Sequence, residues 1–180
     1  MTSWSYWQPL DETYGWGLIK FSNDATTSWW GEDTSFWNVH YKYYVFCQFT
    51  RHIRPGYKII EASGSYQDNH VLVAYSDQDE RLVVVATRYG SANDQITFDL
   101  SQFDTTTAGA VSSWVTDTVL SKKYKAQSPE VNSLSGNLLQ TTLNPWSIQS
   151  IEVEGVKMLS GATLSPTISS TNVSVSNEFK

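Results

Sequence analysis

The pattern of hydrophobic positions changes once along the chain, at residues 54–56. Before this point, apolar and aromatic residues recur every three or four positions, which predicts a helix of about four turns. A polar residue among residues 33–35 is expected to cap its start. Arg54-Pro55-Gly56 is expected to end it, because proline cannot continue the hydrogen-bond ladder and glycine accepts a left-handed exit. The stripe comprises Phe36, Val39, His40, Tyr43, Phe46, Cys47 and Phe49 or Thr50.

After Gly56 the pattern turns into short alternating or β-branched runs that are separated by polar turns. Seven or eight such runs at this spacing are typical of an antiparallel sandwich. The polar segments 76–80 and 89–94 are expected to be turns between neighbouring strands. The expected strands are residues 58–62, 71–75, 82–87, 95–99, 111–116, 138–143 and 148–153.

The two ends of the chain have a different character. Residues 3–10 predict a short strand that Pro9 ends, and the glycine-dotted segment 11–34 predicts a long loop. Beyond Gly155 the chain is rich in Ser and Thr without a hydrophobic period, which predicts a flexible tail. The sequence therefore divides into an N-terminal part, a β-sandwich and a flexible tail, with expected bounds of 1–56, 57–157 and 158–180.

Tryptophan is unevenly distributed along the chain. Aromatic faces stack on the apolar faces of sugars, so a tryptophan cluster suits a carbohydrate cleft. Packing in a core is nevertheless the commoner use of any single tryptophan. Six of the eight tryptophans fall before residue 40, namely Trp4, Trp7, Trp16, Trp29, Trp30 and Trp37.

Charge and cysteine content exclude several classes of function. A net charge of −6 and a pI near 4.9 argue against a nucleic-acid or anionic-membrane partner, because both require clustered Lys and Arg. The single Cys47 excludes an internal disulfide and a cysteine zinc site, and we expect it to be buried on the helix. No run of about 18 apolar residues predicts a membrane span, and the sequence after Met1 does not have the pattern of a signal peptide.

Catalytic chemistry is hard to locate in the sequence. Sugar hydrolysis requires two carboxyl groups that flank the scissile bond. The acids of the aromatic N-terminal part, Asp11, Glu12, Glu32 and Asp33, lie in predicted loops without a strand to fix their separation. We therefore predict no catalytic residue in this chain.

The acids and histidines of the sequence do not form a recognisable metal-binding pattern. Segment 77–80 has three acids but lacks the glycine and distal glutamate of an EF-hand, so a solvated turn is the better interpretation. His40, His52 and His70 do not share a metal-ligand spacing. We predict no metal ion and no cofactor. Asn172 starts a formal N-glycosylation motif, which applies only to a secreted protein.

Three segments resemble the C-terminal third of glycoside hydrolase family 30, and most closely its endo-β-1,6-galactanase-like members. These segments are Ser3-Trp4-Ser5-Tyr6-Trp7-Gln8-Pro9, Trp16-Gly17-Leu18-Ile19 and residues 42–56. The specific part is the tyrosine-rich helix with its Phe-Thr-Arg-His-Ile-Arg-Pro-Gly exit. The resemblance runs on through the strands at 71–75 and 82–87 and covers roughly residues 3–155.

The resemblance implies a mainly β fold, in which an antiparallel β-sandwich follows the last β/α unit of an incomplete (β/α)8 TIM barrel. The eighth strand would be residues 3–8 and the eighth helix about residues 34–52. A complete barrel takes ~200 residues or more, so seven of its β/α units are expected to be missing from this chain. The family's two catalytic glutamates lie on the fourth and seventh strands, so the chain alone is predicted to be inactive.

The resemblance also implies a substrate-binding role for two residues. Trp7, and with it Trp4, match eighth-strand tryptophans that lie beside the sugar in the innermost subsite. The chain departs from the family pattern at Cys47, Thr50 and Arg88, where glycine, serine and asparagine are usual.

The function that this resemblance implies is that of a C-terminal fragment of a retaining glycoside hydrolase acting on a β-linked polysaccharide. The polymer would be of the β-1,6-galactan or β-glucan type, and the full-length enzyme would be secreted. Its expected partners are a polysaccharide or oligosaccharide substrate and the missing barrel portion. The alternative is a non-catalytic carbohydrate-binding or structural β-sandwich module.

Overall fold

The computed structural model describes residues 5–6, 9–11, 16–21, 37–64, 70–159 and 167–169. Within these ranges the protein is mainly β with one α-helix, and its two largest sheets are built chiefly from antiparallel pairs. No helix in the described ranges is long and apolar enough to cross a membrane. The chain divides into two compact units, Met1–Cys47 and Gln48–Lys180.

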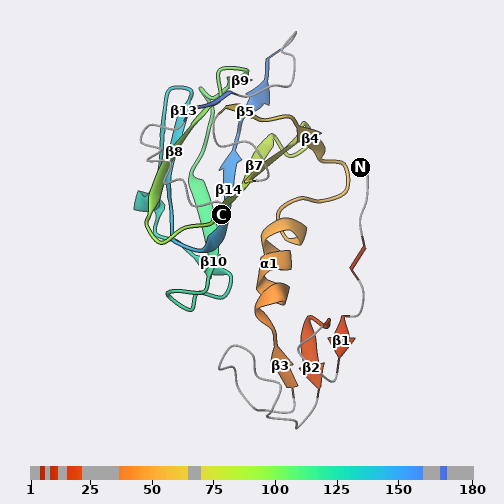
Figure 1. Ribbon diagram of the computed structural model, residues 1–180. Coiled ribbons are helices and arrows are strands. Elements are labelled where there is room, and N and C mark those ends of the chain that lie inside the picture. The colour runs from red at the N-terminus through yellow and green to blue at the C-terminus, as the bar shows by residue number, and fades with distance from the viewer. Residues whose placement is uncertain are drawn as a thin grey trace. The chain divides into compact units, whose positions relative to one another are not determined.

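The first unit contains a small three-stranded sheet in the order β1 (Leu10–Asp11), β2 (Ile19–Phe21) and β3 (Trp37–Val39) (Figure 1). β1 pairs with β2 in parallel, and β3 pairs with β2 in the antiparallel sense.

The strand predicted over residues 3–10 is wrong for Ser5 and Tyr6, which belong to no strand. Tyr6 is instead held by its side chain. Its hydroxyl donates a hydrogen bond to the carbonyl of Trp16 at 2.6 Å, and its ring packs edge-on against Phe46 with centroids 4.6 Å apart. The (β/α)8 unit that the resemblance implies therefore stays a prediction.

The helix α1 (Tyr41–Thr50) begins later than the stripe predicts. Residues 37–39 form β3 because pairing with β2 competes successfully with local helical periodicity. The cap is His40: its Nδ1 accepts the N–H of Lys42 at 3.1 Å, and its carbonyl accepts the N–H of Tyr43 at 2.9 Å. The residues first expected to cap, 33–35, lie outside the described residues.

α1 ends at Thr50, four residues before Arg54, so the predicted end at Arg54-Pro55-Gly56 is too late. These residues form a separate turn, which the N–H of Tyr57 closes by donating to the carbonyl of Arg54 at 3.1 Å. Gly56 has a φ of +98°, the left-handed exit expected of this glycine. Cys47 is a free thiol and is buried, as its position on the stripe predicts.

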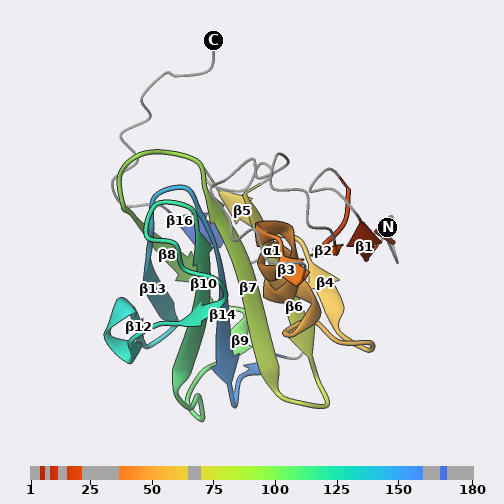
Figure 2. The ribbon, with the colours of Figure 1, turned by 90° about the horizontal axis from the view of Figure 1, so that it is seen from below.

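The second unit contains a β-sandwich, and all seven strands predicted in it are confirmed. One sheet has six strands in the order β11-β10-β14-β7-β6-β4, and the other has five in the order β12-β13-β8-β16-β5 (Figure 2). The strands are β4 (Lys58–Ile60), β5 (Ser63–Gly64), β6 (Val71–Ser76), β7 (Arg81–Arg88), β8 (Asp94–Asp99), β9 (Phe103–Asp104), β10 (Val111–Asp117), β11 (Lys125–Ala126), β12 (Asn132–Ser135), β13 (Leu138–Leu143), β14 (Ser147–Glu154), β15 (Lys157–Met158) and β16 (Thr167–Ser169), with a short 3-10 helix, η2 (Pro129–Val131), before β12.

The core lies between the two sheets and follows strand alternation. On β7, Leu82 and Val84 face it, and on β14 Ile151 and Val153 do so. β14 is buried along both faces except at Glu154, so its second face is also covered. The other core members are Ile60, Val73, Tyr75, Ala86, Ile96, Phe98, Leu100, Phe103, Leu139, Leu143 and Val156.

The flexible tail predicted for 158–180 is wrong at residues 167–169. These residues form β16, which pairs with β8 in the antiparallel sense and with β5 in parallel. Backbone pairing between neighbouring strands needs no hydrophobic period, so composition alone gave no sign of it.

The core predicts a sharp contrast between two apolar truncations. Ile151→Ala should lower the free energy of unfolding by about 2–5 kcal/mol, because Ile151 is fully buried and its removal leaves a cavity. Leu138→Ala, at a side chain that is 44% exposed, should change it by roughly 0.5 kcal/mol or less. Urea unfolding of both variants measures the difference, and equal midpoints would contradict this description of the core.

Candidate functional site

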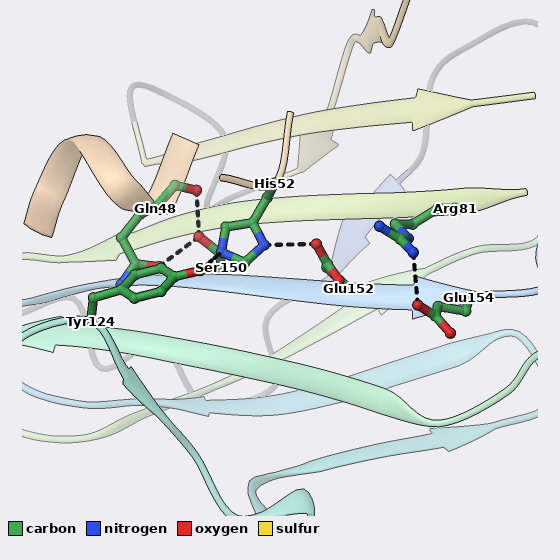
Figure 3. Close-up of polar contacts among 7 residues, drawn as sticks. All are labelled: Gln48, His52, Arg81, Tyr124, Ser150, Glu152 and Glu154. Atoms are coloured by element: carbon green, nitrogen blue, oxygen red, sulfur yellow. Dashed lines mark hydrogen bonds and ion pairs between the residues drawn. The ribbon is translucent and has the colours of Figure 1, made fainter. Parts of the chain in front are cut away.

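The most distinctive polar arrangement lies on the face of the six-stranded sheet that points away from the core. Ser150 and Glu152 alternate along β14 with the core residues Ile151 and Val153, so they share this outer face. Both are buried. They are covered by the end of α1 and the turn that follows it, which contribute Gln48 and His52 (Figure 3).

His52 is the centre of this arrangement, which we call the helix-exit cluster: Gln48, His52, Tyr124, Ser150 and Glu152. The ring is 3% exposed, and its Nδ1 lies 2.7 Å from Oε1 of Glu152. An ionised carboxylate only accepts hydrogen bonds, so Nδ1 carries the proton. Nε2 lies 3.0 Å from the hydroxyl of Tyr124, within hydrogen-bond distance. Both nitrogens are thus satisfied without water.

Gln48 makes the second connection between α1 and the sheet. Its Nε2 donates to the hydroxyl of Thr116 on β10 at 3.0 Å. The hydroxyl of Ser150 lies 2.5 Å from the main-chain oxygen of Gln48 and 2.6 Å from its Oε1. Since Gln48 is fully buried, these bonds replace the water that its amide would otherwise bind.

Aromatic rings close the cluster on one side. The ring of His52 lies 4.7 Å from that of Trp114 on β10, measured between centroids. Trp114 and Tyr124 stack at 6.3 Å with an angle of 10° between their planes. The guanidinium of Arg51 lies 5.0 Å from the centroid of Tyr124, a distance suited to a cation–π contact.

A second ion pair lies further along β14. The guanidinium of Arg81 donates to Oε1 of Glu154 at 2.9 Å, and the side chain of Glu154 is 58% exposed.

Tyr57, which follows the turn after α1, has a raised pKa. Burial, and then a hydrogen bond with Asp79, raise the pKa of its hydroxyl above the ordinary value, so the hydroxyl stays protonated at neutral pH.

The contacts that run from Glu152 through His52 to Tyr124 follow the order of a proton relay, but their geometry is that of a structural contact between the helix exit and the sheet. Each end of the imidazole is already bonded, and the ring is closed off from solvent. A retaining glycosidase needs two carboxyl groups about 5 Å apart, whereas Glu152 faces a histidine. The cluster therefore fastens the helix exit to the sheet.

A shallow hollow of about 180 Å³ lies on the outer face of the five-stranded sheet. Its walls come from β8, η2, β12 and β13 and offer mainly amide and hydroxyl groups. Such groups can donate and accept hydrogen bonds, but none of the described lining residues is aromatic. The lining residues are Gln95, Ile96, Thr97, Glu130, Val131, Asn132, Ser133, Gln140, Thr141 and Thr142.

The predicted site residues Trp4, Trp7 and Asn172 lie outside the described residues, so their roles stay predictions. Asp11 is described, and its Oδ2 accepts the N–H groups of Trp16 and Gly17, a use that stabilises the loop. Among the residues that the structure describes, no group of three or more His, Cys, Asp and Glu side chains could hold a metal ion.

Acids of the segment 77–80 are likewise engaged in local contacts. Asp77 pairs with Lys58, Asp79 accepts the hydroxyl of Ser76 at 3.1 Å, and Glu80 lies 3.3 Å from Lys157. The segment is the turn between β6 and β7, as predicted.

Sequence reasoning missed the helix-exit cluster. Its two central residues lie 100 positions apart, and no motif links them. Ser150 and Glu152 alternate with Ile151 and Val153, a pattern that is typical of a strand with one solvent-facing side, so it does not signal that this face is covered.

Comparison with known proteins gives one curated relative. The chain is 32% identical over 157 residues to an endo-β-1,6-galactanase of Hypocrea rufa. The match covers 86% of this chain but only 29% of the relative's length. No protein-family model matches the chain.

Solved structures of xylanases share the fold. A family 30 subfamily 8 xylanase of Clostridium acetobutylicum has a TM-score of 0.54 at 20% identity, covering 76% of this chain and 31% of its own. The catalytic domain of a family 30 xylanase from Talaromyces cellulolyticus has a TM-score of 0.54 at 22% identity, covering 76% and 27%.

A third structure, a family 30 endoxylanase of Clostridium papyrosolvens, has a TM-score of 0.51 at 26% identity and covers 65% of this chain and 28% of its own. In each case the chain spans less than a third of the protein it matches. Taken together with the galactanase match, these findings show that the chain is homologous to one part of the glycoside hydrolase family 30 enzymes.

Proposed function

We propose that this chain is the C-terminal part of a retaining glycoside hydrolase that cleaves a β-linked polysaccharide of the β-1,6-galactan type. The observation that carries the proposal is the 157-residue match to the endo-β-1,6-galactanase. The xylanases support the reaction class but act on a different polymer, so only the galactanase match favours galactan. A β-glucan is the alternative substrate.

The chemistry of this enzyme would be divided between this chain and the rest of the protein. The resemblance assigns the two catalytic glutamates to the fourth and seventh barrel strands. It matches Trp7 and Trp4 to tryptophans that would contact the sugar. The C-terminal ends of barrel strands are where such binding residues belong. The whole enzyme would be secreted, with Asn172 available for glycosylation.

The sandwich would have a structural role in this enzyme. The helix-exit cluster ties the last residues of α1 to β10 and β14 through buried hydrogen bonds. Under this proposal α1 is the eighth barrel helix, and the cluster binds the last residues of that helix and the turn after it to the sandwich.

The first prediction concerns activity. The isolated chain should release no reducing sugar from β-1,6-galactan oligosaccharides, because it lacks the paired catalytic carboxylates. A chimera, in which this chain replaces the matched segment of the Hypocrea rufa enzyme, should release it. Circular dichroism of both proteins provides the control for folding. Turnover by the isolated chain would overturn the proposal, and so would a folded chimera that cleaves none of the galactan.

The second prediction concerns the helix-exit cluster and compares two glutamates on β14. Glu152→Ala leaves the buried Nδ1–H of His52 without its acceptor and should lower the free energy of unfolding by about 1–3 kcal/mol. Glu154→Ala removes an ion pair whose carboxylate is 58% exposed and should lower it by about 0–1 kcal/mol. Chemical unfolding of the two variants measures the contrast, and a smaller loss for Glu152→Ala than for Glu154→Ala would contradict the anchor.

A further inference from the structure

Two exposed aromatic residues meet at one end of the six-stranded sheet. Tyr89 directly follows β7, and Trp146 directly precedes β14. Their ring centroids lie 4.3 Å apart with an angle of 80° between the planes. Tyr89 is 68% exposed and Trp146 is 39% exposed, so the pair presents a large aromatic surface to solvent.

The backbone of Trp146 is held in an unfavourable conformation. Its φ is +47°, in the left-handed region that bulky residues rarely adopt. Pro145 and Trp146 form the turn between β13 and β14, where glycine commonly follows proline in turns with a positive φ. Strain of this kind persists only where the surroundings enforce it, and it gathers at ligand-binding sites.

Neighbouring loops enforce this conformation. The N–H of Trp146 donates to the carbonyl of Gly90 at 3.2 Å, which joins the turn to the segment after β7. The hydroxyl of Ser147 donates to the carbonyl of Asn144 at 2.6 Å. The turn that carries Trp146 is therefore held by hydrogen bonds to the main-chain carbonyls of Gly90 and Asn144.

Polar groups flank the pair at the same end of the sheet. Arg88, half-buried, pairs with Asp94 at 3.7 Å and donates from Nε to the carbonyl of Ala92 at 3.3 Å. The amide of Asn144 donates to Oδ2 of Asp117 at 3.3 Å. Stacking rings beside fixed charged and amide groups are the combination that recognises a pyranose, which has an apolar face and a rim of hydroxyls.

We propose that Tyr89 and Trp146 form a non-catalytic binding site for a pyranose unit of a β-linked polysaccharide. The choice of ligand rests on the proposed function, since the relatives are polysaccharide hydrolases. The site would hold the polymer on the sandwich. It gives the side domain a second role besides anchoring.

The test is affinity electrophoresis of the full 180-residue chain in gels that contain β-1,6-galactan, β-glucan or xylan. The wild-type chain should be retarded by at least one of them. Tyr89→Ala and Trp146→Asn should each weaken the apparent affinity by roughly five- to tenfold, because each removes one stacking ring. Asparagine tolerates a positive φ, so Trp146→Asn should keep the melting temperature of the wild type within a few degrees.

Two controls separate sugar binding from general stickiness. Leu120→Ser changes an apolar side chain that is 59% exposed near the same end, and Leu138→Ser changes one that is 44% exposed elsewhere. Both variants should bind as the wild type does. Absence of retardation in all three gels, or equal loss in Leu138→Ser, would overturn the site. So would a concentration-dependent dimer that Tyr89→Ala dissociates without any retardation, because it would assign the pair to a protein contact.

The outcome is independent of the activity experiment. Retardation that depends on Tyr89 together with an inactive chimera would keep this site and reject the proposed hydrolase. Cleavage by the chimera without retardation of the chain would have the opposite meaning.

Discussion

The buried hydrogen bond between His52 and Glu152 is the contact on which the attachment of the helix exit to the six-stranded sheet depends. It brings a carboxylate and an imidazole together beneath the exit of α1, where neither has access to much water. The desolvation of both groups is offset only because every polar atom of the ring has a partner. One helical turn earlier, the buried side chain of Gln48 is likewise hydrogen-bonded, here to the hydroxyl of Ser150. The outer face of the sheet is thus polar and still buried.

Much of the sandwich could be predicted from the sequence, and the reasons are local. The run Leu82 to Thr87 is β-branched and bounded by turn residues, and β7 forms there with one residue added at each end. The hydrophobic pattern failed to predict the structure where pairing with a distant strand determined it. Residues 37–39 continue the helical stripe, yet they pair with β2, and residues 167–169 have no period, yet they pair with β8. The cluster around His52 depends on contacts 100 residues apart, which periodicity cannot reveal.

The comparisons with known proteins bear on the family and the fold, whereas the geometry bears on individual side chains. The relation to family 30 rests on the endoxylanase structure at 26% identity together with the galactanase match, whereas the xylanases under 25% identity show the fold alone. In the helix-exit cluster the carboxylate of Glu152 faces the imidazole of His52 rather than a second carboxyl group. What the sandwich offers instead is a rigid support with an aromatic pair at one end.

The central claim is that buried hydrogen bonds make the helix exit part of the sandwich. Amide hydrogen exchange at His52 and Ile53, whose N–H groups bond to the carbonyl of Phe49, tests it most directly. In the native chain these amides should exchange as slowly as those in the middle of β14. In Glu152→Ala they should exchange by local opening and become faster, while the β14 amides remain protected. Fast exchange at His52 and Ile53 in the native chain would contradict the claim.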